Sequence, residues 1–183
     1  PDDEPGRAVV IGTDKAAKKN PGLHVWSLHG EELQFVPVPR PNNVDVQRGF
    51  LLGGRRTDLA VCNARGNLSM YVFRIHPQTG KLEDVTAGGR IPTPELADPY
   101  GLCLYLRPRD GALFVIASTQ TGRQDELHQY RLEDDGSGHV KGTYVRAFGS
   151  GSIASYVEGL VADDELGWVY ASDEDHAVLQ FHA

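Results

Sequence analysis

The stretch EGLVADDELGWVYASDED, residues 158–175, carries seven carboxylates in eighteen positions, yet it encloses the apolar run 168–171. Segments 160–162 and 168–171 have the apolar and aromatic character of short strands. Residues 163–167 between them are acidic and end in Gly, which is typical of a tight turn. The stretch therefore predicts a β-hairpin.

The predicted hairpin separates its acidic residues into two groups. Asp163, Asp164 and Glu165 fall at the turn, whereas Glu158 meets the run 173–175 at the opposite, open end. Because the two ends of a hairpin lie far apart, the acidic residues at the turn cannot share a site with those at the open end. The functional question therefore concerns Glu158 and its partners.

Strand-like segments recur along the chain at an interval of about fifty residues. The segments HVWSL, MYVFRI, LHQYRL and AVLQF end at Leu28, Ile75, Leu132 and Phe181, with spacings of 47, 57 and 49 residues. Another apolar strand that ends in small or polar residues precedes each of them. Three of these pairs follow an opening segment, at 42–50, 100–106 and 158–163, and three precede an edge-like segment, at 32–39, 82–88 and 139–148.

Four strands per unit at this period are typical of β-propeller blades. Gly and Pro together number 32, which favours many short strands over helices. We predict one all-β domain over residues 1–183, a partial β-propeller of about three and a half four-stranded antiparallel blades. It opens on the second strand of one blade and stops after the third strand of another. The predicted blades lie near 8–39, 43–88, 100–148 and 158–181.

Composition excludes several classes of function. The net charge of −7 argues against general binding of nucleic acid, and no apolar run approaches the roughly 18 residues that span a membrane. Cys62 and Cys103 lie in apolar runs, so we expect buried free thiols. The seven His residues form no zinc-binding pattern. The chain opens at Pro1 without Met or a visible signal peptide, so these features do not give its location.

Blade geometry places particular polar residues at one rim. In a blade, the start of the first strand and the end of the second strand lie at the same rim, so these positions in successive blades surround one opening. The step from Asn42 to Arg65 is 23 residues, and so is the step from Tyr100 to Arg123. The residues at these positions are Asn42, Asn43, Tyr100 and Glu158 at first-strand starts, and Lys15, Arg65, Arg123 and the run 173–175 at second-strand ends.

The predicted rim combines three cations with carboxylates. Taken singly, each residue has an ordinary role as a solvated loop charge, a turn former or a packing residue. Together, Glu158 and Glu174 offer the hard oxygen ligands that suit Ca²⁺, and Arg65 offers a fork for phosphate oxygens. Lys15 adds a point charge. Such a set suits metal-assisted hydrolysis of phosphate esters.

Five strings carry a resemblance to a known family. They are VIGTDK (10–15), NNVDVQRGF (42–50), YGLCLY (100–105), ELHQYRLEDDGSG (126–138) and VEGLVADDELGWVYASDEDHAVLQF (157–181). In this order and spacing the chain resembles the β-propeller phytases, calcium-dependent phosphatases that release inorganic phosphate from myo-inositol hexakisphosphate. The resemblance implies a six-bladed fold, a 3-phytase-type phosphoric monoester hydrolase, Ca²⁺ as cofactor, and a secreted or periplasmic location.

The resemblance also implies roles for the rim residues. It makes Lys15, Arg65 and Arg123 phosphate-binding, with Arg123 where a Lys is common, and it places Asn42 and Asn43 beside the substrate phosphates. Tyr100, Glu158 and Glu174 become the catalytic centre and the calcium ligands.

This chain departs from the family by its length and by its first residues. PDDEPGR (1–7) does not match the acidic N-terminal stretch that supplies further ligands, and later carboxylates that complete the calcium site are absent. Three interpretations stay open: a piece of a phytase, a non-catalytic propeller module that binds phosphate or calcium and assists another domain or subunit, and a general protein-interaction propeller. We also expect self-association or a missing propeller half, because incomplete rings leave blades uncovered.

Overall fold

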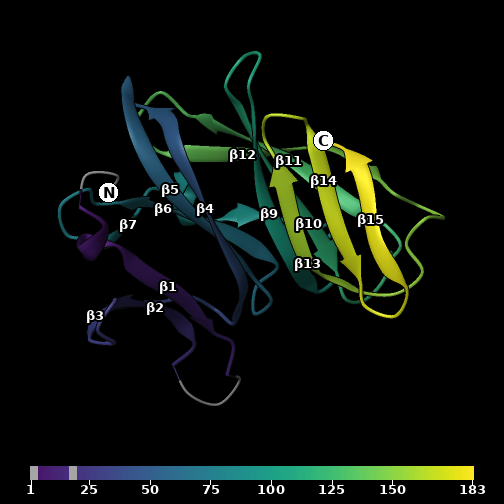
Figure 1. Cartoon of the computed structure of the whole chain (residues 1–183), viewed down its shortest axis with the longest axis horizontal. Coiled ribbons are helices and arrows are strands. Elements are labelled where there is room, and N and C mark those ends of the chain that lie inside the picture. Colours follow the sequence, from purple (N-terminus) through teal and green to yellow (C-terminus); the bar gives the residue numbers. More distant parts are fainter. Residues whose placement is uncertain (1–3, 17–19) are drawn as a thin grey trace.

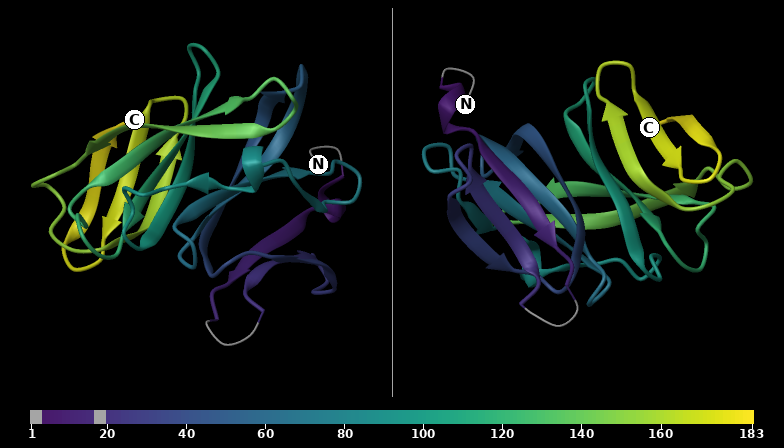
Figure 2. Two further views of the ribbon diagram at one scale, coloured as in Figure 1. Left: turned by 180° about the vertical axis from the view of Figure 1, so that it is seen from behind. Right: turned by 60° about the horizontal axis from the view of Figure 1, so that its bottom comes forward.

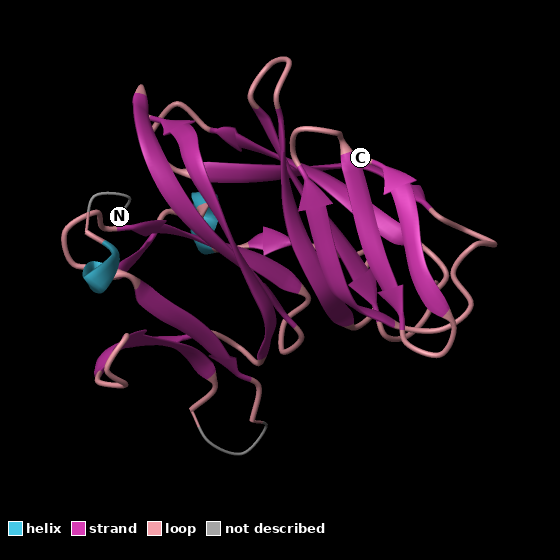
Figure 3. Ribbon diagram, viewed as in Figure 1, coloured by secondary structure: helices cyan, strands magenta, loops and turns pink. Residues whose placement is uncertain are grey.

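The computed structural model describes residues 4–16 and 20–183 (Figure 1). Figure 3 shows that strands make up nearly all of its regular structure. The helical elements in the described ranges are two short 3₁₀ helices, η1 (Pro5–Arg7) and η2 (Ala87–Gly89). No helix in this part of the chain is long and apolar enough to span a membrane. The prediction of an all-β fold is confirmed.

The described strands form four antiparallel sheets, numbered here as blades one to four. Blade one contains β1 (Val9–Asp14), β2 (Gly22–Ser27) and β3 (Glu32–Pro37). Blade two contains β4 (Pro41–Leu52), β5 (Arg55–Ala64), β6 (Ser69–Ile75) and β7 (Leu82–Asp84), with β8 (Ile91–Pro92) also paired to β6. Blade three contains β9 (Pro99–Arg107), β10 (Ala112–Thr119), β11 (Leu127–Asp134) and β12 (Val140–Phe148). Blade four contains β13 (Val157–Asp163), β14 (Trp168–Asp173) and β15 (Ala177–His182).

The blades follow one another along an open arc. Blade one, in purple, and blade four, in yellow, lie at opposite ends of the molecule in two independent views (Figure 2). The first strands β4, β9 and β13 are neighbours, since β9 contacts both of the others, and β1 contacts β4. This places the first strands along the inner side of the arc, as in a partial β-propeller, and the described strands do not close a ring.

Three hydrophobic cores hold successive blades together. Leu23 and Phe73 belong to the core between blades one and two, and Val72 and Leu104 to the core between blades two and three. Ile116 and Val169 belong to the core between blades three and four. Alternate side chains of each strand therefore enter a core on one face of the sheet.

Both cysteines lie within these cores. Cys62 packs between blades one and two and Cys103 between blades three and four, and both are free thiols with no exposed surface. Burial raises the pKa of each thiol far above its ordinary value. The prediction of buried free thiols is confirmed.

The hairpin predicted over residues 158–175 is confirmed, with longer strands than expected. Asp163 still belongs to β13, and Trp168 begins β14 directly opposite it. The turn is closed by the backbone N–H of Gly167, which donates to the carbonyl of Asp163 over 2.9 Å. Gly167 has φ +70°, a left-handed conformation that side chains other than glycine disfavour.

The outer strand of blade two is shorter than predicted. The expected strand at 82–88 ends at Asp84, and η2 follows it. Gly88 and Gly89 have φ of 66° and 78°, so the backbone leaves the extended conformation here. β8 then resumes pairing with β6 at Met70 and Ser69.

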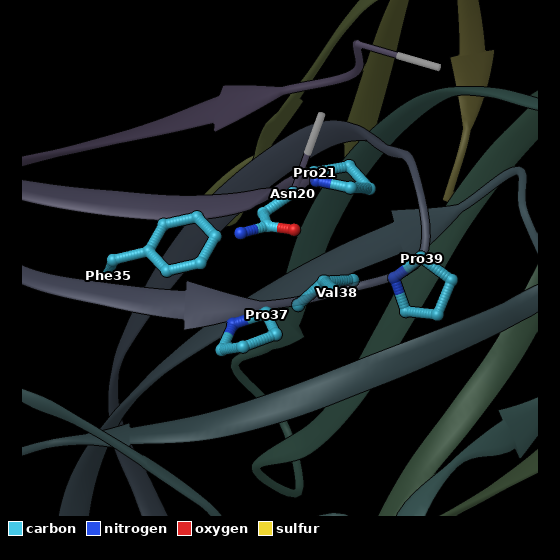
Figure 4. A pocket seen from close by; sticks show the side chains of 6 residues that line it. All are labelled: Asn20, Pro21, Phe35, Pro37, Val38 and Pro39. Carbon is cyan, nitrogen blue, oxygen red and sulfur yellow. The ribbon is translucent and has the colours of Figure 1, made fainter. Parts of the chain in front are cut away.

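The outward face of blade one carries an apolar hollow of about 520 Å³ (Figure 4). Figure 4 shows Phe35 from β3 on one side of it and the prolines around the end of that strand on the other. Its lining residues are Asn20, Pro21, Phe35, Pro37, Val38 and Pro39.

Candidate functional site: a polar network at the central rim

One backbone hydrogen bond recurs at the rim of three blades. In blades two, three and four, the residue after the second strand donates its N–H to the carbonyl of the residue before the first strand. These bonds measure 2.9 Å in each blade and join Arg65 to Arg40, Gln120 to Asp98, and Glu174 to Tyr156. The repeated bond fixes Arg65, Gln120 and Glu174 as structurally equivalent residues.

A second set of equivalent residues lies one step inside the first. Asn42, Tyr100 and Glu158 are each the second residue of their blade's first strand. Because these strands are neighbours at the inner side of the arc, their side chains converge. The rim predicted from the strand pattern thus contains Asn42, Tyr100 and Glu158 in mutual contact.

The side-chain amide of Asn42 links blades two, three and four. Asn42 is 4% exposed, and its Nδ2 lies 2.8 Å from Asn43 Oδ1, 2.9 Å from the Tyr100 carbonyl and 3.0 Å from Glu158 Oε1. Asn43 Nδ2 donates in turn to the Glu158 carbonyl over 3.2 Å. These acceptors fix the orientation of the Asn42 amide, so its Oδ1 faces the opposite way.

Two cations from different blades lie at that Oδ1 atom. Lys15 Nζ is 3.4 Å from it and Arg65 Nη1 is 3.5 Å from it. Lys15 Nζ also lies 3.5 Å from Glu158 Oε1. Asn42 Oδ1 therefore marks a position where one acceptor oxygen meets donors from two blades, as an oxygen of a bound anion would.

The Tyr100 hydroxyl joins the two candidate calcium ligands. It lies 3.0 Å from Glu158 Oε2 and 2.9 Å from Glu174 Oε1. Burial, followed by the hydrogen bonds to Glu174 and Glu158, raises the pKa of Tyr100 far above its ordinary value. The phenol stays protonated, and its single proton can satisfy only one of the two carboxylates at a time.

Glu158 keeps its charge against partial burial. Burial acts to raise its pKa, but hydrogen bonds from Asn42 and Tyr100 and the charge of Lys15 together hold that pKa below its ordinary value. The carboxylate is therefore ionised at neutral pH and below, and it remains available as a cation ligand.

The guanidinium of Arg65 is already held by two side chains of blade three. Its Nε donates to Asp98 Oδ1 over 2.6 Å, and its Nη2 donates to Asp98 Oδ2 and, over 2.6 Å, to Gln120 Oε1. The Tyr100 ring lies 5.9 Å from the guanidinium carbon. The Nε–Nη2 fork expected to grip a phosphate is thus occupied, and Nη1 is the nitrogen that faces Lys15 and Asn42 Oδ1.

Arg123 is not joined to this network. Its Nη2 pairs with Glu126 Oε1, and its side chain is 72% exposed. Gln120, rather than Arg123, is the equivalent of Arg65 in blade three. The prediction of three cations around one opening is therefore corrected. Two cations, Lys15 and Arg65, belong to the network, and the neutral amide of Gln120 takes the third position.

The count of 23 residues failed because the two hairpins differ in length. Pro41 pairs with Ala64, 23 residues on, whereas Pro99 pairs with Thr119, 20 residues on. The β4–β5 hairpin carries an additional register shift between Gln47 and Phe50. A count of 23 residues from Tyr100 therefore reaches Arg123, three residues beyond Gln120.

Of the acidic run 173–175, only Glu174 contacts the network. Asp173 is 4% exposed and accepts the Ala154 N–H over 2.7 Å, and Asp175 accepts the Ser155 hydroxyl over 2.7 Å. Both of these aspartates fix the loop that leads into β13. Period-two alternation along β14 could have separated Glu174 from its neighbours.

Three residues of the network escaped the sequence analysis. Asp98 and Gln120 hold Arg65, and Asn63 accepts the Asn43 N–H over 2.9 Å while donating to the Tyr100 carbonyl over 2.9 Å. Asn63 has no exposed surface. A buried amide inside the apolar run of β5 was the available signal for Asn63, since such a group needs partners.

The oxygen atoms around Tyr100 fit a hard cation only in part. Within residues 4–16 and 20–183, no group of three or more His, Cys, Asp or Glu side chains has the arrangement of a metal site. One oxygen of Glu158 and one of Glu174 nevertheless lie 3.0 Å and 2.9 Å from the Tyr100 hydroxyl. Ca²⁺ takes 6–8 oxygens, so these residues supply the donor type but not the full number.

The fold and the rim together define a partial β-propeller whose inner rim presents two cations beside two carboxylates. Comparison with known proteins agrees with this class. A family model described as Phytase matches residues 2–183, and the 3-phytase of Bacillus subtilis (strain 168) is 35% identical over 181 residues. The chain belongs to the phytase family. That alignment covers 98% of this chain and 45% of the Bacillus enzyme, so the chain spans less than half of its relative.

Proposed function

We propose that the whole protein is a calcium-dependent phytase that hydrolyses phosphomonoesters of myo-inositol hexakisphosphate, and that this chain carries one half of its active site. The observation that supports this most is the polar network itself. Two cations meet one acceptor position at Asn42 Oδ1, and two carboxylates meet one phenol beside it. A substrate phosphate needs donors of the first kind and a cation ligated by groups of the second kind.

Lys15 and Arg65 are the proposed phosphate-binding groups. An oxygen of the substrate would lie beside Asn42 Oδ1, within reach of Lys15 Nζ and Arg65 Nη1, which both approach that atom. Asn42 and Asn43 would hold these donors and Glu158 in place through the hydrogen bonds described above. Arg123 is exposed and pairs with Glu126 through Nη2, so it does not belong to this set of donors.

Glu158 and Glu174 are the proposed calcium ligands, with the Tyr100 hydroxyl between them. Calcium, when bound, would neutralise phosphate charge and lower the pKa of a water molecule until it can attack phosphorus. Tyr100 stays protonated and would orient the carboxylates, because its hydroxyl can donate a hydrogen bond to either of them. Further oxygen ligands would come from other blades of a longer protein or from a second chain.

Phosphate release from phytate, measured with calcium and with a chelator, tests this function. Glu174→Gln should reduce release severalfold or more and weaken calcium binding, because a charged oxygen ligand is lost. Glu165→Gln is a matched control, since Glu165 lies in the turn at the other end of the same hairpin. Equal activity with calcium and with chelator in a chain that hydrolyses phytate would contradict calcium dependence.

A second candidate function rests on the incomplete ligand set. With two carboxylates and a phenol at the rim, this chain by itself would act as a non-catalytic module that binds phosphate or calcium and assists another domain or subunit. Calorimetric binding of phytate without any phosphate release would favour this alternative. We further propose a secreted or periplasmic location, which the resemblance implies, and fractionation of cells that express the full gene would test it.

A further inference from the structure

We propose that Asp98 is a positioning residue that, with Gln120, holds Arg65 so that a single nitrogen, Nη1, faces the anion. This inference rests on the proposed function, and it assigns to Asp98 a role in phosphate binding that acts through Arg65. It follows from which nitrogens of the guanidinium are already used.

The first step of the argument is the geometry of the Arg65–Asp98 pair. Both carboxylate oxygens of Asp98 accept from Arg65, one from Nε over 2.6 Å and the other from Nη2. The side chains are 14% and 25% exposed. A two-point ion pair shielded from solvent restricts the guanidinium plane far more than a single exposed contact does.

Gln120 removes the remaining freedom of Nη2. Its Oε1 accepts from that nitrogen over 2.6 Å, and its own backbone N–H donates to the Asp98 carbonyl over 2.9 Å. Asp98 is fixed in turn, because its N–H donates to Thr119 Oγ1 over 2.9 Å. Three donors of the guanidinium are thus committed to blade three, whereas Nη1 lies 3.5 Å from Asn42 Oδ1 of blade two.

The consequence is a defined approach for the ligand. Nη1 lies 3.5 Å from Asn42 Oδ1, the atom that Lys15 Nζ also approaches. A phosphate oxygen beside this atom would therefore receive an end-on donor from Arg65 and a point charge from Lys15, rather than the side-on fork that an unrestrained arginine offers.

Charge alone and positioning make opposite predictions for Asp98→Asn. If Asp98 acted only through its negative charge beside the rim, its removal would strengthen anion binding, since one repulsive carboxylate is lost. If Asp98 positions Arg65, the same change should weaken phytate binding by about tenfold, the order expected for one misplaced charge-assisted hydrogen bond. Asp98→Glu should recover part of the loss by restoring the carboxylate.

The experiment titrates phytate into the parent, Asp98→Asn, Asp98→Glu and Asp110→Asn at constant calcium, with thermal unfolding to confirm that each variant folds. Asp110 is the matched control, because it makes the same two-point contact with Arg107 at the opposite end of β9. Asp110→Asn should bind phytate like the parent. Unchanged or tighter binding by Asp98→Asn would overturn the positioning role.

A readout independent of ligand separates this inference from the proposed function. In the parent without phytate, the Arg65 Nε–H should give a protected NMR signal that Asp98→Asn loses and Asp110→Asn keeps. A parent that binds no phytate but shows this protection would refute the proposed function and leave the positioning in place. Loss of protection in neither variant, or in both, would overturn the positioning itself.

Discussion

At the scale of single residues, function is proposed to depend on a few side chains whose partners come from other blades. Arg65 is the clearest case, because its charge is partly neutralised by Asp98 while Nη1 stays directed at the rim. A buried or half-buried ion pair of this kind need not stabilise the fold. Here we propose that the pair orients Nη1 of Arg65 toward the rim.

We expect Arg65→Ala to weaken phytate binding by about tenfold, the order of one charge-assisted hydrogen bond, and to lower hydrolysis where the enzyme is complete. Arg65→Lys should recover only part of the affinity, because an ammonium lacks the planar fork that holds Asp98 at two points while Nη1 faces the ligand. Calorimetry with phytate at fixed calcium measures both effects. Parent-like binding by both variants would mean that Arg65 does not contribute to phytate binding.

The lowered pKa of Glu158 predicts the pH range of cation binding. A carboxylate with a lowered pKa stays charged as the pH falls from neutral into mildly acidic values, and it loses its charge only on passing through that lowered pKa. Calcium affinity measured from pH 8 to pH 5 should therefore decline less for the parent than for Lys15→Met. That variant lacks a charge that lowers the pKa of Glu158, so parallel declines would contradict this account.

At the scale of elements, polar side chains from one blade fasten the strands of the next. Asp164, from the turn of the β13–β14 hairpin, accepts the Leu106 N–H over 2.9 Å and lies 3.2 Å from Gln47 Nε2. The acidic turn predicted from the sequence thus contacts blades two and three. Hydrogen bonds to a charged acceptor are worth about 1.5–3 kcal/mol each when they are shielded from water.

We expect Asp164→Ala to lower the free energy of unfolding by about 1–3 kcal/mol, because it leaves the Leu106 N–H without its acceptor. Urea unfolding followed by tryptophan fluorescence measures the change. Glu165→Ala, one residue along the same turn, is the control and should stay within about 0.5 kcal/mol of the parent. Equal losses in the two variants would show that the turn conformation, not the contact, matters.

We expect His128 in β11 to make stability depend on pH. It is 3% exposed, neither ring nitrogen has a hydrogen-bond partner among the described residues, and burial lowers its pKa despite the nearby charges of Glu126 and Glu95. The folded chain then binds fewer protons than the unfolded chain, so stability falls as the pH drops below about 6.5, the ordinary value for histidine.

We expect His128→Phe to remove this loss. The difference in unfolding free energy between variant and parent should grow in favour of the variant from pH 8 to pH 5, as measured by urea unfolding. The exposed His29 is the control, and His29→Gln should change the free energy of unfolding equally at pH 8 and at pH 5. A constant difference between His128→Phe and the parent across this range would contradict the account.

At the scale of the whole molecule, the open arc leaves the outer faces of blades one and four uncovered. On blade four, Val161 and Val178 are 59% and 69% exposed and lie on the same face as Tyr170, whereas the opposite face packs on blade three. Apolar side chains on an uncovered sheet favour association. Further blades of a longer chain or a second copy would cover this face.

We expect the chain to form dimers or larger assemblies, and we expect Val161→Lys combined with Val178→Lys to shift it toward the monomer. Sedimentation velocity over a range of concentrations measures this shift. Leu166→Lys is the control, since Leu166 is 66% exposed but lies in the hairpin turn rather than on the sheet face. A parent that stays monomeric at high concentration would refute the prediction.

The sequence by itself determined the class of fold and most of the rim. Alternating apolar segments, turn residues and a period near fifty predict blades, because each blade must bury the same strand faces and reverse direction at the same places. Lys15, Asn42, Tyr100 and Glu158 were predictable for that reason, since strand ends recur at the rim. Tertiary structure alone decided that Gln120 takes the place expected of Arg123, and that Arg65 is held by Asp98. The first depends on the different lengths of the two hairpins, and the second on a neighbour in another blade. Neither hairpin length nor the partner across a blade boundary is encoded in the local pattern of residues.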